Sequence, residues 1–120
     1  MTLSRNFKQT LGQRLQTDAD FRHALLQECV DSMLRGDPEE LAVGLMTLRD
    51  FINGTIGFKA LGEILGKTPK NLMRMVNVKA NPTAYNLFHV LQALQELEGI
   101  RLETTVVART RRGAAKPRKK

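Results

Sequence analysis

The chain of 120 residues contains no tryptophan, and aromatic residues make up only 5% of it. Its core must therefore be built mainly from leucine, valine, isoleucine and methionine side chains. Cys29 is the single cysteine, so a disulfide within the chain is excluded. No apolar run approaches the roughly 20 residues that a transmembrane helix needs, and the N-terminus has no hydrophobic signal segment. These absences predict a protein of the reducing cytoplasm that has no membrane partner.

Residue patterns that support catalysis or metal binding are also missing. His23 and His89 lie far apart in the sequence, and neither forms a cluster of metal-ligand spacing with Cys29. Acidic residues such as Asp18 and Asp37 stand at expected helix starts, where capping accounts for them. The sequence contains neither a nucleophile elbow nor a phosphate-binding loop. We therefore expect no enzyme activity, no cofactor and no metal.

The positive charge is concentrated in two segments. The formal net charge is +7, yet seven of the 19 basic residues and none of the 12 acidic ones lie between Arg109 and Lys120. The rest of the chain is therefore neutral as a whole. The second segment holds five basic residues and one acid: Lys59, Lys67, Lys70, Arg74, Lys79 and Glu63. A local basic patch on a neutral body is typical of nucleic-acid binding.

Hydrophobic periodicity predicts an all-α fold of about five helices. The first 16 residues are expected to form an N-terminal arm or a short helix. Capping residues and turn glycines then predict helices over residues 17–35, 37–53, 57–65, 68–76 and 83–98. In the last of these helices we expect Leu87, Phe88, Leu91 and Leu94 to be buried.

After Gly99 the hydrophobic period changes to two, which is typical of a β-strand. Its alternating positions Ile100, Leu102, Thr104 and Val106 are candidates for dimerisation. A lone strand is unstable, so the same strand of a second subunit, or a toxin, would have to pair with it. The alternative is an extended segment packed on the helices. We thus divide the chain into an arm (1–16), a helical domain ending in the strand (17–107) and a disordered basic tail (108–120).

Residues 57–77 have the pattern of a helix-turn-helix, in which a second helix enters the major groove of DNA. Small Gly62 would permit a close approach of the two helices, and Gly66 would permit the sharp turn. The expected core of the motif consists of Leu61, Gly62, Leu65, Gly66, Leu72 and Met75.

The outward side chains of this motif are candidates for contact with DNA. Asparagine reads adenine, and arginine or lysine reads guanine, while long basic side chains also contact phosphates. The alternative is a helical hairpin with a solvated basic face, and the pattern alone fits both. The candidate DNA-binding residues are Thr68, Pro69, Lys70, Asn71, Arg74, Lys67, Lys79 and Asn81.

The chain resembles the HigA-like addiction-module antidotes, helix-turn-helix regulators with a λ-repressor-like fold. The resemblance runs from about Phe7 to Val107 and centres on RDFINGTIGFKALGEILGKTPKNLMRMV, followed by NVKANPTAYNLFHVLQAL. It includes the GDPEE segment (36–40) and the start of the last helix at residues 81–83. Gly62 and Lys67 depart from the commonest residues of the family's turn, and the basic tail lies outside its pattern.

This resemblance implies a homodimer that binds a palindromic operator in its own promoter. It also implies a possible partner, a RelE/ParE-type toxin that cleaves RNA or poisons gyrase, although many relatives look like solitary regulators. Two other readings stay open at this stage. One is a protein-interaction module with a vestigial helix-turn-helix that binds a toxin or another protein. The other is RNA binding through the tail, against which the scarcity of aromatic residues argues.

Overall fold

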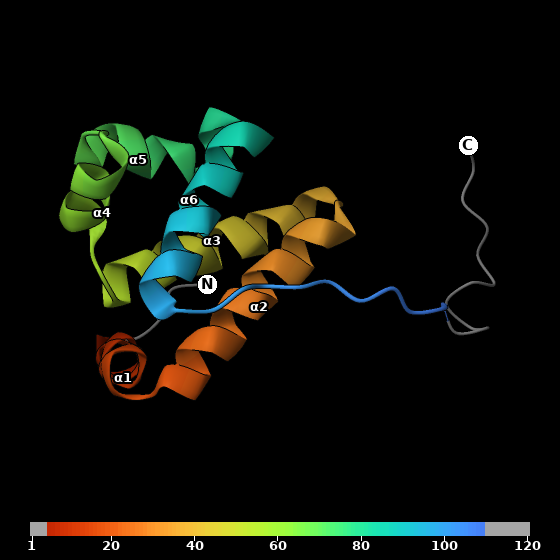
Figure 1. The fold of residues 1–120 in the computed structure, drawn as a ribbon, viewed down its shortest axis with the longest axis horizontal. Helices are drawn as coiled ribbons and strands as arrows, with labels where there is room; N and C mark the ends of the chain where they lie inside the picture. The colour runs from red at the N-terminus through yellow and green to blue at the C-terminus, as the bar shows by residue number, and fades with distance from the viewer. Residues whose placement is uncertain (1–4, 110–120) are drawn as a thin grey trace.

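The computed structural model describes the backbone of residues 5–109, and side chains from Gln9 onward. Helices account for nearly all regular structure in this range, which contains no strand (Figure 1). The all-α prediction is therefore confirmed. The elements are α1 (Arg5–Thr17), α2 (Ala19–Arg35), α3 (Pro38–Gly54), α4 (Phe58–Leu65), α5 (Pro69–Met75), the 3-10 helix η1 (Val78–Ala80) and α6 (Ala84–Glu98).

Capping side chains start four of the helices. Asp18, Asp37, Thr68 and Thr83 each accept a hydrogen bond from the backbone N–H three residues further on, at 2.9–3.1 Å. Each bond satisfies an N–H group that has no partner inside its helix. At the other ends, Gly36, Gly66 and Gly99 adopt left-handed backbone conformations. These local signals explain why the observed helix limits lie within two residues of the predicted ones.

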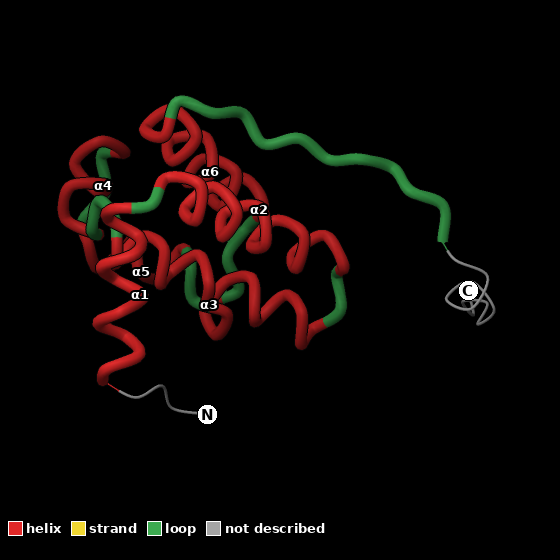
Figure 2. Tube along the Cα trace, turned by 90° about the horizontal axis from the view of Figure 1, so that it is seen from below, coloured by secondary structure: helices red, strands yellow, loops and turns green. Residues whose placement is uncertain are grey.

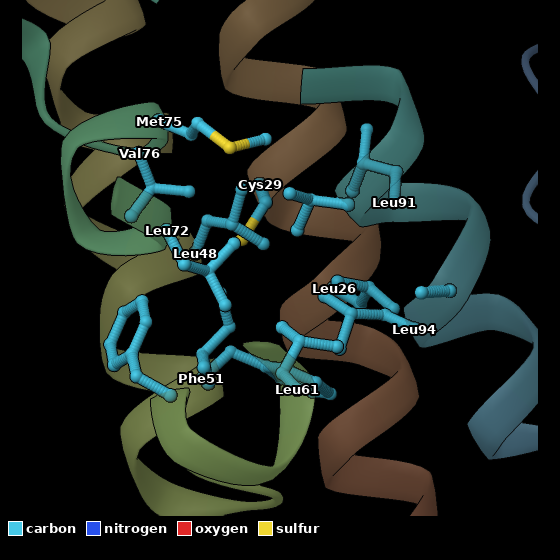
Figure 3. Packing of buried hydrophobic residues seen from close by; sticks show 14 of the residues in the cluster. Leu26, Cys29, Leu48, Phe51, Leu61, Leu72, Met75, Val76, Leu91 and Leu94 are labelled. Carbon is cyan, nitrogen blue, oxygen red and sulfur yellow. The ribbon is translucent and has the colours of Figure 1, made fainter. Parts of the chain in front are cut away.

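The antiparallel pair α2 and α3 forms the centre of the structure, and the other helices pack around it (Figure 1). Gly44 of α3 lies against the α2 backbone, since a Cβ atom there would approach the Cys29 carbonyl oxygen to 2.9 Å. Leu91 and Leu94 of α6 point toward α2 (Figure 3). The buried cluster consists of Leu15, Leu26, Cys29, Leu48, Phe51, Ile52, Phe58, Leu61, Leu72, Met75, Val76, Val90, Leu91, Ala93 and Leu94.

The thiol of Cys29 is part of this core and has no accessible surface. Burial raises its pKa to about 12, because the charged thiolate would be poorly solvated there. At neutral pH the side chain is therefore a protonated, unreactive thiol that packs as a small hydrophobic group.

A partly buried ion pair joins α6 to α2. The Arg22 guanidinium donates to both carboxylate oxygens of Glu98 at 3.0 Å, and also to the Leu15 carbonyl oxygen of α1 at 3.0 Å. The His23 Nε2 atom lies 3.0 Å from the same carboxylate. Only 12% of the Glu98 side chain is exposed. One carboxylate thus holds the C-terminal end of α6 on α2, and Arg22 connects both to α1.

The residues that follow α6 form an extended segment, which we call the C-terminal arm (100–109). The strand expected at residues 100–107 is not formed in the described chain, because no neighbouring strand supplies its backbone hydrogen bonds. The root of the arm is nevertheless anchored: Ile100 and Leu102 pack against the core, and the Leu102 N–H donates to the Gln95 side chain at 2.8 Å. Beyond it the arm leaves the helices (Figure 2).

Some core assignments were wrong: Leu34, Met46 and Ile64, which the periodicity places on apolar helix faces, are exposed. Phe88 was expected to be buried, yet 66% of its surface is exposed, and Val90 and Ala93 occupy the buried face of α6 instead. The reason is geometric, because α6 packs through positions 87, 90, 91 and 94, and residue 88 points away from that face. Tyr85, one turn earlier, is exposed as well, and the centroids of its ring and of the His89 ring lie 4.9 Å apart.

Two predictions concern segments at the ends of the chain. The N-terminal segment, expected as an arm or short helix, contributes α1, whose Leu15 side chain belongs to the buried cluster. The basic tail from residue 110 lies outside the described residues, so its predicted disorder stays a prediction. None of the helices described is long and apolar enough to cross a bilayer.

The ion pair between Arg22 and Glu98 predicts a stability effect. Glu98→Ala leaves the partly buried guanidinium without its carboxylate, so the free energy of unfolding should fall by about 2–4 kcal/mol. Glu103→Ala is the control, because it removes a carboxylate from the exposed Arg101 pair and should cost less than about 1 kcal/mol. Urea denaturation followed by circular dichroism measures both. Equal losses in the two variants would contradict a structural role for Glu98.

Candidate nucleic-acid interface

A short turn separates α4 from α5. Gly66 has a φ of +71°, and the Lys67 N–H donates to the Gly62 carbonyl oxygen at 2.8 Å. The Thr68 hydroxyl then caps α5 by accepting from the Asn71 N–H at 3.1 Å. These bonds fix the three-residue connection between the two helices, so α5 starts in a position determined by the end of α4.

Gly62 lies against this turn. A Cβ atom at residue 62 would be 2.5 Å from the carbonyl oxygen of Lys67, which is backbone and cannot rotate away. The sequence suggested that Gly62 allows two helices to approach each other, whereas the structure places it under the turn itself. The contact also accounts for a polar residue after Gly66, because it is the backbone of Lys67 that packs inward while its side chain is exposed.

Apolar side chains hold α5 on the rest of the domain. Leu72 and Met75 of α5 are buried together with Leu61 of α4, and Leu65 is half-buried beside them. Figure 3 shows Leu72 and Met75 on the side of α5 that faces the core. The opposite side is exposed and consists of Pro69, Lys70, Asn71, Met73 and Arg74.

An open hollow of about 360 Å³ lies beside α5. It brings together four of the predicted DNA-binding residues, Lys67, Asn71, Arg74 and Asn81, which come from the turn, from α5 and from the loop after η1. That loop turns back toward α5 at Asn81, whose φ is +52°. The complete lining is Lys67, Asn71, Arg74, Met75, Ala80, Asn81, Pro82, Thr83 and Asn86.

Sequence reasoning missed two polar residues of this hollow, Thr83 and Asn86. Both belong to the start of α6, where the Asn86 N–H donates to the Thr83 hydroxyl at 3.1 Å. The capping pattern identified Thr83 as a helix start, but nothing in the sequence indicates that this start faces α5. The remaining predicted residues, Thr68, Pro69, Lys70 and Lys79, are exposed but do not line the hollow.

The electrostatics of this region are one-sided. Lys59, Lys67, Lys70, Arg74 and Lys79 are all exposed, and none forms an ion pair with a carboxylate of the described residues. The lining of the hollow contains two cations, three amide side chains and a hydroxyl, and no carboxylate. Such a surface attracts anions, and its amides can both donate and accept hydrogen bonds.

A second hollow of about 330 Å³ differs in its chemistry. It lies between α1, α2, α3 and α6, and its walls are largely apolar, with Leu15, Phe51 and Leu94 among them. Its charged residues are Arg22 and Glu98, which are engaged with each other. The hollow beside α5 therefore offers the stronger site for a charged ligand.

The cations and amides around the hollow beside α5 are suited to binding an anionic ligand. In the described residues no three His, Cys, Asp or Glu side chains form a group that could hold a metal ion. Comparison of the chain with protein-family models, curated proteins and solved structures finds no match. The exposed cations and amides around α5 are therefore the features of the chain that bear on its function.

The contact beneath the turn predicts the effect of a single methyl group. Gly62→Ala should lower the free energy of unfolding by about 1–3 kcal/mol, because the new methyl group displaces the Lys67 carbonyl. Gly12→Ala is the matched control: a Cβ atom there meets nothing within 4 Å, and alanine favours the interior of α1. Thermal and urea unfolding measure both variants. A stable Gly62→Ala protein would show that the turn tolerates displacement.

Proposed function

We propose that this protein is a sequence-specific transcriptional regulator that binds double-stranded DNA through α4 and α5 as a λ-repressor-like helix-turn-helix. The observation that carries the proposal is the acid-free hollow beside α5, in which Lys67, Asn71, Arg74 and Asn81 meet. Cations and amides exposed on a short helix match the phosphates and base edges of the major groove. Five exposed basic residues support the same function, since none of them is neutralised by a carboxylate of the described chain: Lys59, Lys67, Lys70, Arg74 and Lys79.

The proposed roles follow from position. Lys70, Asn71 and Arg74 lie on the exposed side of α5 and contact base edges. Lys67 precedes α5, while Lys79 and Asn81 follow it, and these three contact the phosphate backbone on either side. Thr68 and Pro69 set the start and direction of the helix.

The resemblance to HigA-like antidotes makes the proposal more specific. The regulator is then a cytoplasmic homodimer that represses its own promoter and acts as the antitoxin of a RelE/ParE-type toxin. This part depends on the resemblance alone. A second candidate, a protein-interaction module with a vestigial helix-turn-helix, is favoured by the exposed apolar side chains of Met73, Tyr85 and Phe88. It predicts a stable protein complex and weak DNA binding dominated by salt.

Substitution of Arg74 tests the role of α5. Arg74→Ala should weaken binding to the operator by about 1–3 kcal/mol, since a bidentate contact to a base edge is lost. Arg35→Ala is the control, because it removes one exposed cation at the α2–α3 connection, which lies at the opposite end of the body from α4 and α5 (Figure 1). Fluorescence anisotropy with upstream DNA, against random DNA as competitor, measures both. Unchanged affinity of Arg74→Ala would remove this residue from the interface.

Deletion of residues 109–120 tests the basic tail, most of which lies outside the described residues. Seven positive charges are removed, so binding to operator and random DNA should weaken by similar factors. The dependence of the binding constant on salt concentration should also become shallower, because fewer counterions are released. The same anisotropy titrations at several salt concentrations provide the measurement. A selective loss of operator binding would instead assign sequence readout to the tail.

A further inference from the structure

The C-terminal arm presents a strand-like segment without a partner. From Glu103 to Arg109 no backbone N–H or C=O group is hydrogen-bonded to another described residue. The arm also exposes apolar side chains: Val106 is 98% exposed and Val107 is 74% exposed. Figures 1 and 2 show from two directions that the arm runs away from the helices after its root. An extended segment with unpaired backbone groups and exposed valines is a template for another strand.

We propose that the arm pairs with the arm of a second copy of this chain, as an antiparallel two-stranded ribbon centred on Thr104. The inference deepens the proposed function, which requires two copies at a palindromic operator. Only the effect of dimerisation on operator binding rests on the proposed function, because the pairing itself involves no residue of α4 or α5.

The alternation of side chains determines which face of the arm is shared. Ile100 and Leu102 pack on the core of their own chain, and side chains two residues apart lie on the same face of an extended chain. Thr104, Val106 and Ala108 therefore continue that face. When the two-fold axis is perpendicular to the plane of a two-stranded ribbon, equivalent residues of the two copies lie on the same face of the ribbon. Two copies related in this way form one continuous apolar face.

Repulsion between like charges disfavours the two neighbouring registers, in which the ribbon is centred on residue 103 or on residue 105. With the centre on Thr104, Leu102 lies opposite Val106 of the second copy, and Ile100 lies opposite Ala108. Moving the centre to residue 103 sets two Glu103 carboxylates against each other. Moving it to residue 105 sets Arg101 opposite Arg109 of the second copy. Like charges directly opposite each other destabilise a strand pair, so both shifts are disfavoured.

The same register provides a favourable contact at the end of the arm. Arg109 lies opposite Gly99 of the second copy, at the carboxyl end of its α6, where the helix dipole is negative. The exposed carboxylate of Glu96 lies in this last turn. The arm is therefore complementary to a second copy in its shared face and in charge, and its backbone groups from Glu103 to Arg109 have no competing partner among the described residues.

Cysteine cross-linking of the full chain without DNA tests the register. In Thr104→Cys the two new thiols face each other across the axis, with Cα atoms about 4.5–5.5 Å apart, which a disulfide can span. In Thr105→Cys the corresponding Cα atoms are about 8 Å apart, beyond that reach. Under copper-phenanthroline oxidation, Thr104→Cys should give mostly covalent dimer and Thr105→Cys mostly monomer. Cys29 is buried and does not compete.

Sedimentation equilibrium tests the shared face independently. Val106→Asp places a carboxylate opposite Leu102 and should raise the dimer dissociation constant by about tenfold or more. Val107→Asp makes the same change on the other face, opposite Arg101, and should leave the dimer intact. Both positions are exposed in the single chain, so neither variant should alter its unfolding temperature.

Three results would overturn the proposal. A wild-type chain that stays monomeric at high concentration leaves the arm to a different protein, such as a toxin. Equal cross-linking of the two cysteine variants contradicts the register, as does equal weakening by the two aspartates. DNA binding is measured on separate samples. A dimer that fails to bind DNA would refute the proposed function and leave the arm pairing standing.

Discussion

The carboxylate of Glu98 is the constraint on which the position of α6 depends. Through Arg22 and His23 it ties the last turn of α6 to α2, and Arg22 extends the connection to the carbonyl oxygen of Leu15 in α1. With its C-terminal end fixed in this way, α6 presents Leu91 and Leu94 to the core. Its N-terminal end then supplies Thr83 and Asn86 to the hollow beside α5. A partly buried charge at one end of a helix thus helps to position polar groups at the other end.

Local features of the structure could be read from the sequence, whereas relations between distant segments could not. Capping at Asp18, Asp37 and Thr68 depends on neighbouring residues only, so the helix limits were predictable. Phe88 was misassigned because the apolar stripe of α6 is wide enough to admit it, and only packing decides which side faces inward. The strand predicted in the arm has the right alternation, but its formation depends on hydrogen bonds that this chain does not supply to itself.

In the candidate site, too, the single residues could be predicted from the sequence, whereas their arrangement in space could not. The pattern identified Lys67, Asn71, Arg74 and Asn81 one by one, and the structure shows that they border one hollow. The arrangement depends on the left-handed turn at Asn81, which returns the chain toward α5. The Glu98 ion pair joins residues 76 positions apart, and no local pattern indicates such a contact.

The residues that position α5 differ from the residues that give its outer surface its binding chemistry. Gly62 meets the backbone of Lys67, and the inward side chains Leu72 and Met75 complete the attachment. The exposed side chains after Pro69, those of Lys70, Asn71, Met73 and Arg74, take no part in it. The outer surface of this helix can therefore change over evolution without moving the helix itself. A fold of this kind can acquire a new binding preference through a few surface substitutions while its scaffold stays the same.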